Sequence, residues 1–253
     1  MKRVDRSMVT RMAGVVLFVA AWQALAVLGN TRMLPGVTDV LLQLWELILS
    51  GELFEHALST LSKGFAGLAI ALLAGAAVGI ACARNRYADA ALHPVISMLY
   101  PVPKLALYPV VVLVFGFGAT SKIVQVGLEC FFPIFVQMYA GTRAVPRNLL
   151  WLAENNEVGP LGMVREVVLP TLLPYLLTGL RVATPIMLIV MCVTEFIGES
   201  EGLGYLISRY SSYFDTASAF AVIVVLGLFG LAADRLIVHL RTRVVFWERG
   251  VSL

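Results

Sequence analysis

Residues 167–182 read VVLPTLLPYLLTGLRV, an apolar run in which Pro170 and Pro174 stand four residues apart. A proline inside a helix removes a backbone donor and clashes with the preceding turn, whereas a proline in the first turn costs little. The pair therefore predicts a helix boundary: Pro170 ends or bends one helix, and Pro174 lies in the first turn of the next. A rigid bend at this boundary, called here the elbow, would transmit a displacement of the preceding loop to the span that follows. The alternative is a plain helix boundary without a mechanical role.

The composition places this run in a membrane. Of the 253 residues, 59% are hydrophobic and 14% are charged, whereas a soluble globular domain has about 25% charged residues. A helix crosses the hydrocarbon core with about 20 apolar residues, and backbone groups left unpaired in lipid are costly. The apolar runs lack the alternation of barrel strands, so the chain is predicted to be an all-α polytopic membrane protein. Almost nothing remains for a soluble domain, and the sequence contains no G-x-x-x-x-G-K-[ST] phosphate-binding loop.

Six transmembrane helices are expected, forming a single domain over residues 1–253. They lie at about 12–28, 64–83, 94–117, 123–140, 171–197 and 217–240. The first run has an alternative interpretation as a cleaved signal peptide, because Ala24-Leu25-Ala26 resembles a cleavage site. Its length and the spans that follow favour a membrane span. An even number of spans leaves both ends of the chain on one side.

Basic residues are divided unevenly between the two sides, and cytoplasmic segments of membrane proteins carry the excess. With the N-terminus in the cytoplasm, the inner segments hold twelve: Lys2, Arg3, Arg6, Arg11, Arg84, Arg86, Arg143, Arg147, Arg165, Arg241, Arg243 and Arg249. The outer segments hold four: Arg32, Lys63, Lys122 and Arg209. Both termini are therefore predicted to be cytoplasmic.

Two connections are long enough to have structure of their own. In the outer loop, VTDVLLQLWELILSGELF (37–54) has apolar residues at helical spacing and predicts a short amphipathic helix on the outer face, free or packed against the bundle. The inner loop 141–170, GTRAVPRNLLWLAENNEVGPLGMVREVVLP, is too polar to cross the membrane. It predicts two short helices, about Arg147–Glu157 and Leu161–Val168, broken at VGPLG. A hairpin on the cytoplasmic face that leads directly into a span is a docking surface for a soluble partner.

This inner loop and the run after it resemble the coupling loop of permease subunits of bacterial ATP-binding-cassette (ABC) importers. In that family a motif near E-A-A-x-x-x-G precedes a Leu-Pro, a second proline and Gly-Leu-Arg, which match Leu169-Pro170, Pro174 and Gly179-Leu180-Arg181. PVPKLALYPVVVLVFGFGATSKI (101–123) and TEFIGESEGLGYLI (194–207) resemble signatures of the branch that imports nitrate, sulfonates and taurine. MLPGVTDVLLQLWE (33–46) matches the family's opening motif loosely. The similarity covers nearly the whole chain and implies the six-helix, MetI-like fold of type I importers, with a cytoplasmic pair of coupling helices.

The resemblance assigns roles to particular residues. Those implied to contact the ATPase are Leu152, Ala153, Glu154, Glu157, Val158, Gly159, Pro160, Leu161 and Gly162. Those implied to form the elbow are Pro170, Pro174, Gly179 and Arg181. The chain departs from the family in one respect: the Glu-Ala-Ala falls on Trp151-Leu152-Ala153, and the glycine falls on Glu157. Glu154 and the shifted Gly159 are candidates to replace the missing acid and glycine.

Four residues within spans are candidates to line the translocation path: Tyr100, Lys104, Glu129 and Glu195. Lys104 lies among three prolines, so its segment is expected to be a broken helix, which is tolerated at membrane depth where it lines a cavity. The alternative for Lys104 is a side chain that reaches the inner interface. For both glutamates the alternative is a buried polar anchor between helices, and Glu195 falls on an acid common in the family.

Other residue patterns bear on packing and cofactors. Gly75 and Gly79 have GxxxG spacing and predict close helix packing, whereas the acid that could pair with Arg181 is not evident. Cysteines and histidines show no metal-ligand spacing, so neither a metal nor another cofactor is expected.

The resemblance implies the permease subunit of a binding-protein-dependent importer in a bacterial inner membrane. Its cargo would be a small anion, such as nitrate, a sulfonate or taurine, or a vitamin precursor. The chain would not be an enzyme, since ATP is hydrolysed by a cytoplasmic ATPase dimer. The other implied partners are an extracytoplasmic binding protein, a second permease copy and the lipid bilayer, and no nucleic acid. An ion-gradient-coupled secondary transporter is the alternative, disfavoured because no inverted repeat is apparent.

Overall fold

The computed structural model describes residues 6–29, 33–198 and 200–248. Five residues named in the sequence or charge patterns lie outside these ranges: Lys2, Arg3, Arg32, Glu199 and Arg249. The described chain is helical nearly throughout. Its elements are α1 (Arg6–Gly29), α2 (Val37–Leu49), α3 (Glu52–Arg84), α4 (Arg86–Leu99), the 3₁₀ turn η1 (Lys104–Leu107), α5 (Tyr108–Phe115), α6 (Ala119–Arg143), α7 (Arg147–Asn155), α8 (Pro160–Met163), the π-helical turn η2 (Val164–Val168), α9 (Leu169–Phe196), α10 (Leu203–Ser212), α11 (Thr216–Val244) and the 3₁₀ turn η3 (Phe246–Glu248).

Within the described ranges, five helices are long and apolar enough to cross a membrane: α1, α3, α6, α9 with the turns before it, and α11. The pair α4 and η1–α5 adds a sixth span if it is counted as one, and its two limbs are bent by 86°. The predicted all-α polytopic bundle is therefore confirmed. The break expected around Lys104 is present, and its first limb begins at Arg86, before the expected start at residue 94.

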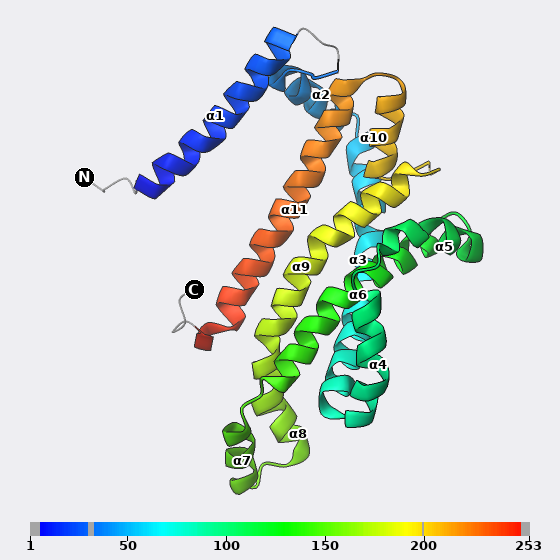
Figure 1. Ribbon diagram of the computed structural model, residues 1–253. Helices are drawn as coiled ribbons and strands as arrows, with labels where there is room; N and C mark the ends of the chain where they lie inside the picture. The colour runs from blue at the N-terminus through cyan, green and yellow to red at the C-terminus, as the bar shows by residue number, and fades with distance from the viewer. Residues whose placement is uncertain (1–5, 30–32, 199, 249–253) are drawn as a thin grey trace.

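Three long helices form the centre of the bundle (Figure 1). α3, α6 and α9 share an apolar core that includes Val126, Ile134 and Met191, all fully buried. α2, α10 and α11 form a second apolar cluster at one end of the molecule, around Leu206 and Val222. The short helices α7 and α8 protrude from the opposite end, and α1 points away from the bundle (Figure 1).

Small residues on α3 allow it to approach α6 closely. A Cβ added at Gly67 would lie 2.7 Å from the carbonyl oxygen of Ile123, and one at Gly75 would lie 3.0 Å from that of Phe131. A Cβ added at Gly79 would likewise lie 3.0 Å from the carbonyl oxygen of Phe135. The close packing predicted from Gly75 and Gly79 is therefore confirmed, and Gly67 extends it by two helical turns.

The amphipathic helix predicted within residues 37–54 is confirmed as α2, which buries Val40 and Leu47 in the cluster with α10 and α11. Leu41 and Ile48 of the predicted apolar face remain exposed. Gly51, at φ 78°, turns the chain from α2 into α3. α3 therefore begins at Glu52, three turns before the expected span, because its first residues pack beneath α10.

The prolines of the opening run are accommodated differently from the prediction. α9 begins at Leu169, so Pro170 lies in its first turn, but Pro174 lies one turn further in, inside the helix. The expectation for Pro174 is therefore wrong. Pro170 cannot donate to the carbonyl four residues before it, and the chain widens into the π-helical turn η2 just ahead of it instead of breaking. The hydroxyl of Thr171 donates to the carbonyl oxygen of Val167 at 2.8 Å and satisfies part of the disturbed backbone.

The close contact between α3 and α6 generates a stability prediction. Gly67→Ala is expected to destabilise the folded protein by about 1–3 kcal/mol, because the added methyl group forces two helix backbones apart. The measurement is reversible unfolding in detergent. Gly14→Ala on α1 is the matched control, because a Cβ there meets no atom within 4 Å. An equal response of the two variants would contradict the close packing.

Candidate functional site

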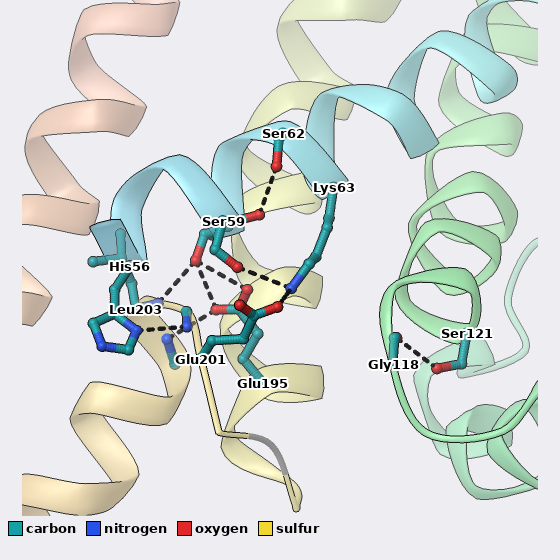
Figure 2. Close-up of polar contacts among 12 residues, drawn as sticks. His56, Ser59, Ser62, Lys63, Gly118, Ser121, Glu195, Glu201 and Leu203 are labelled. Carbon is teal, nitrogen blue, oxygen red and sulfur yellow. Dashed lines mark hydrogen bonds and ion pairs between the residues drawn. The ribbon is translucent and has the colours of Figure 1, made fainter. Parts of the chain in front are cut away.

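A buried carboxylate joins three helices at the end of the bundle that carries α10. Glu195, in the last turn of α9, is fully buried. Its carboxylate accepts hydrogen bonds from the hydroxyl of Thr60 on α3, at 2.8 and 2.9 Å, and from the backbone N–H of Gly204 on α10, at 3.0 Å. The hydroxyl of Thr60 in turn accepts from the N–H of Leu203 at 2.8 Å. Figure 2 shows the side chain of Glu195 pointing toward α3, drawn in cyan. We name the cluster of Glu195, Thr60, Leu203 and Gly204 the Glu195 clamp.

The glycines of TEFIGESEGLGYLI explain how this clamp forms. Gly202 has φ 107°, a region that side chains rarely adopt, and a Cβ there would collide with the carboxyl group of Glu195. A Cβ at Gly204 would collide with the carbonyl of Cys192. The N–H of Gly202 donates to Nδ1 of His56 at 2.9 Å, which fixes the loop to α3. An acid followed by closely spaced glycines is thus the sequence signal of a loop that folds over its own carboxylate.

Two partly buried ion pairs lie near the clamp. Lys63 pairs with Glu201 and also donates to the hydroxyl of Ser59 at 2.8 Å (Figure 2). The hydrogen bond from Lys63 lowers the pKa of Glu201. Arg209 on α10 pairs with Glu52 on α3 at 2.5 Å. These contacts hold α10 along the start of α3.

Tyr210 completes the contact between α10 and Glu52. Its hydroxyl donates to Oε2 of Glu52 at 2.8 Å and accepts from Nη2 of Arg209 at 2.9 Å. Burial, together with the hydrogen bond to Glu52, raises the pKa of Tyr210. The tyrosine therefore stays protonated and remains a donor to Glu52.

A second polar cluster lies at the break between α4 and α5. The Nζ of Lys104 donates to the carbonyl oxygens of Tyr100 and Val102, each at 3.1 Å, and so satisfies backbone groups that the broken helix leaves open. The same Nζ lies 3.9 Å from Oε2 of Glu129 and 4.3 Å from the centre of the Phe132 ring. Three of the four candidate path residues therefore lie together, whereas Glu195 belongs to the clamp.

The four candidate path residues leave out two members of this second cluster. Phe132 supplies the aromatic face beneath Lys104, and its ring centre is 6.1 Å from that of Tyr100. Gln125 donates from Nε2 to the backbone oxygen of Lys104 at 3.0 Å and ties the break to α6. Gln125 lies four residues before Glu129 and Phe132 lies three residues after it, so all three share one face of α6. This helical spacing is the sequence signal that could have placed them in the cluster.

The hairpin at the opposite end has an apolar outer surface. Ala153 is buried against the molecule, whereas Trp151, Leu152 and Leu161 are 63%, 59% and 83% exposed. Exposed aromatic and aliphatic side chains of this size mark an interaction surface when they gather in one place. The predicted coupling residues thus lie on both sides of the hairpin: Ala153 on the side packed against the molecule, and Leu152 and Leu161 on the exposed side.

The residue that replaces the family's glycine keeps the conformation of a glycine. Glu157 has φ 56°, in the left-handed region, and follows the end of α7. The N–H of Val158 reaches back to the carbonyl oxygen of Ala153 at 3.0 Å, which closes the helix end as glycine-containing caps do. Gly159 has no positive φ.

The remaining elbow residues connect α9 to its neighbours. Gly179 is buried and would place a Cβ 3.3 Å from the Cα of Ile134 on α6. Arg181 pairs with Asp234 on α11, with Nε 2.6 Å from Oδ1, which identifies the acid that the sequence did not. Among the described residues, no group of three or more histidine, cysteine or acidic side chains could hold a metal ion.

The fold and these sites place the chain among membrane transport permeases. More narrowly, the chain belongs to the family of binding-protein-dependent transport system inner membrane components, because the model of that family matches residues 67–246. It is a permease of the ABC-importer class, and the alternative of an ion-gradient-coupled secondary transporter is not supported.

Individual relatives and a solved structure agree with this family. The chain is 31% identical over 234 residues to the putative aliphatic sulfonates transport permease protein SsuC of Bacillus subtilis (strain 168), an alignment covering 92% of this chain and 85% of that protein. It is 30% identical over 235 residues to the formylaminopyrimidine transport permease protein ThiX of Halalkalibacterium halodurans, covering 92% and 94%. An inward-facing structure of the MetNI methionine ABC transporter matches in fold, with a TM-score of 0.52 and 19% identity over 75% of this chain and 94% of that chain.

The Glu195 clamp generates a second prediction. Thr60→Val is expected to lower the thermal unfolding midpoint, because it removes the hydroxyl that donates to the buried carboxylate of Glu195 and accepts from the N–H of Leu203, at a cost of about 1–3 kcal/mol. Thr178→Val is the control, since its hydroxyl donates only to the carbonyl oxygen of Pro174 within α9. Equal midpoints for the two variants would show that the clamp contributes no stability.

The left-handed residue at the end of α7 generates a third prediction. Glu157→Gly should stabilise the hairpin by about 1 kcal/mol, because glycine avoids the steric cost of this backbone conformation. Hydrogen exchange of the 153–158 amides should slow accordingly. Glu154→Gly, inside α7, is the control and should speed exchange. Faster exchange in Glu157→Gly would contradict the assignment.

Proposed function

We propose that the chain forms the translocation path of an importer for a small anion or vitamin precursor and couples that path to a separate cytoplasmic ATPase dimer, which hydrolyses the ATP. One observation carries the proposal: the exposed apolar hairpin continues without a helix break into α9, a central helix of the bundle. A force applied to the hairpin therefore reaches the bundle core through one helix. The relatives SsuC and ThiX are named as permeases for aliphatic sulfonates and for formylaminopyrimidine, and these names support a small solute as the cargo.

The hairpin lies on the cytoplasmic side in this proposal, with both termini. The excess of inner arginines supports this orientation. α2 and α10 then lie on the outer side, where a binding protein delivers the cargo. The membrane is a bacterial inner membrane, in keeping with the family's description.

The ATPase binds the open side of the hairpin. Leu152 and Leu161 supply apolar contacts, and the hairpin residues Ala153, Glu154, Glu157, Val158, Gly159, Pro160 and Gly162 form or support the surface around them. The elbow then acts as a stiff joint, not as a hinge. Pro170 and Pro174 stand in a continuous helix, while Gly179 and Arg181 fix that helix to α6 and α11.

The path passes the break between α4 and α5, where Tyr100, Lys104 and Glu129 meet. A lysine supplies attraction for an anion, and Tyr100, which is 52% exposed, offers an aromatic edge beside it. Glu129 holds Lys104 in place between cargo molecules, at 3.9 Å. Glu195 takes the anchoring alternative, because its carboxylate is fully buried and accepts hydrogen bonds from two other helices within the clamp.

A second copy of the chain completes the path. In α1, the apolar stretch Met12–Gly29 has no buried residue. An apolar cavity of about 410 Å³ lies between α9 and α11, beside Ile189 and Gly227. These are surfaces that a homodimer would cover.

Reconstitution with the ATPase and binding protein tests the proposal. Leu161→Asp is expected to weaken co-purification of the ATPase about tenfold or more, because it places a charge in an apolar contact. Tyr213→Asp, a 79% exposed position at the opposite end, is the control and should retain the ATPase. The purified complex should contain two permease copies by mass.

The same vesicles test the path. Lys104→Gln should keep the ATPase bound but lose ATP-driven uptake of the cargo. Cargo uptake by vesicles that lack any ATPase, or unchanged ATPase binding by Leu161→Asp, would contradict the proposed function.

A further inference from the structure

A basic cavity lies where the hairpin meets the base of the bundle. Its volume is about 600 Å³, and three arginines from three different helices line it: Arg84 at the end of α3, Arg143 at the end of α6 and Arg147 at the start of α7. Leu150 and Val168 supply apolar wall, and no acidic side chain lines the cavity. Three exposed arginines from three helices thus border one space.

These charges are poorly compensated within the chain. Arg143 makes one long ion pair, with Nη2 3.7 Å from Oδ2 of Asp89, and its side chain is 60% exposed. Arg84 and Arg147 form no ion pair with any residue that the structure describes. Three like charges around one space repel one another, and a bound anion would relieve that repulsion.

The helix ends explain two of the three arginines but not the third. A cation at the C-terminal end of a helix is favourable, so Arg84 and Arg143 are stabilised by α3 and α6 themselves. Arg147 is the first residue of α7, where a cation is unfavourable. The first turn of α7 contains no acidic residue and no side chain that caps it. An anion in the cavity would offset the charge of Arg147 and face the uncapped N–H groups of α7.

We propose that this cavity binds a phosphate group, from the headgroup of an anionic phospholipid or from a soluble phosphate. Guanidinium groups bind phosphate oxygens in pairs, and basic pockets between membrane helices hold anionic headgroups. The apolar walls at Leu150 and Val168 suit the glycerol portion of a lipid. The exposed side chains of Trp151 and Leu161 on the hairpin do not line this cavity.

Occupation of the cavity ties the hairpin to the bundle. Arg147 and Leu150 belong to α7, whereas Arg84 and Arg143 belong to the transmembrane helices. One phosphate bridging these arginines stabilises the docked position of α7. This inference needs neither the proposed cargo nor the proposed orientation, because phosphate groups occur at both faces of a bilayer.

The test uses the full chain in nanodiscs of phosphatidylcholine, alone or with phosphatidylglycerol. The readouts are the thermal unfolding midpoint and the phosphatidylglycerol retained in native mass spectrometry. Each of Arg84→Gln, Arg143→Gln and Arg147→Gln is expected to weaken apparent phosphatidylglycerol affinity about tenfold. The combined pocket variant should lose the upward shift in midpoint that phosphatidylglycerol gives the wild-type chain.

The matched control combines Arg86→Gln, Arg165→Gln and Arg243→Gln. It removes the same charge from the predicted inner segments without touching the cavity, and it should retain the shift.

A second probe, inorganic phosphate in phosphatidylcholine nanodiscs, separates the two sources of the phosphate group. A pocket-dependent shift with inorganic phosphate supports a soluble ligand, and a shift with phosphatidylglycerol alone supports a lipid. If the combined variant does not fold, the phosphatidylglycerol retained by the single pocket variants in native mass spectrometry tests the proposal instead. Equal loss in pocket and control variants, or no response of the wild-type chain to either probe, would overturn the proposal.

Discussion

The close approach of α3 and α6 is the contact on which the rest of the molecule depends. In lipid, no hydrophobic driving force brings helices together, so association relies on van der Waals packing and polar contacts, both of which need close backbones. Gly67, Gly75 and Gly79 provide that closeness by leaving room for the carbonyl groups of α6. Gly64 extends the principle to α9, where a Cβ would lie 3.1 Å from the sulfur of Met187. The three helices therefore form one stiff unit to which the others attach.

The polar groups divide the molecule into two ends with different tasks. At one end the Glu195 clamp and the ion pairs around Lys63 and Arg209 fasten α10 to α3. At the other end the hairpin projects with apolar side chains exposed and arginines gathered beneath it. α9 connects the two, because it follows the hairpin directly and ends at Glu195. The backbone widens into a π-helical turn just ahead of Pro170, and the helix continues without a break from Leu161 to Phe196.

Several site features were predictable because they depend on local sequence. The hairpin followed from polarity and turn residues, and the break around Lys104 followed from three prolines. The family resemblance, aligned on Leu169-Pro170, places the glycine of the coupling motif at Glu157, and the backbone there has the left-handed conformation that glycine favours. Pro174 was placed wrongly because a π-helical turn absorbs the disturbance, and no local pattern signals that response.

The sequence by itself determined that this chain is an all-α membrane protein, which surfaces are apolar and which family it resembles, since these follow from composition, periodicity and motif spacing along the chain. Only the tertiary structure decided the partners of the buried charges. Arg181 meets Asp234, Lys104 meets Phe132 and Glu129, and Glu195 meets Thr60 and the N–H of Gly204. The reason is physical: an ionic or hydrogen-bonded partner lies within a few ångströms in space, and helix packing, not sequence separation, sets that distance.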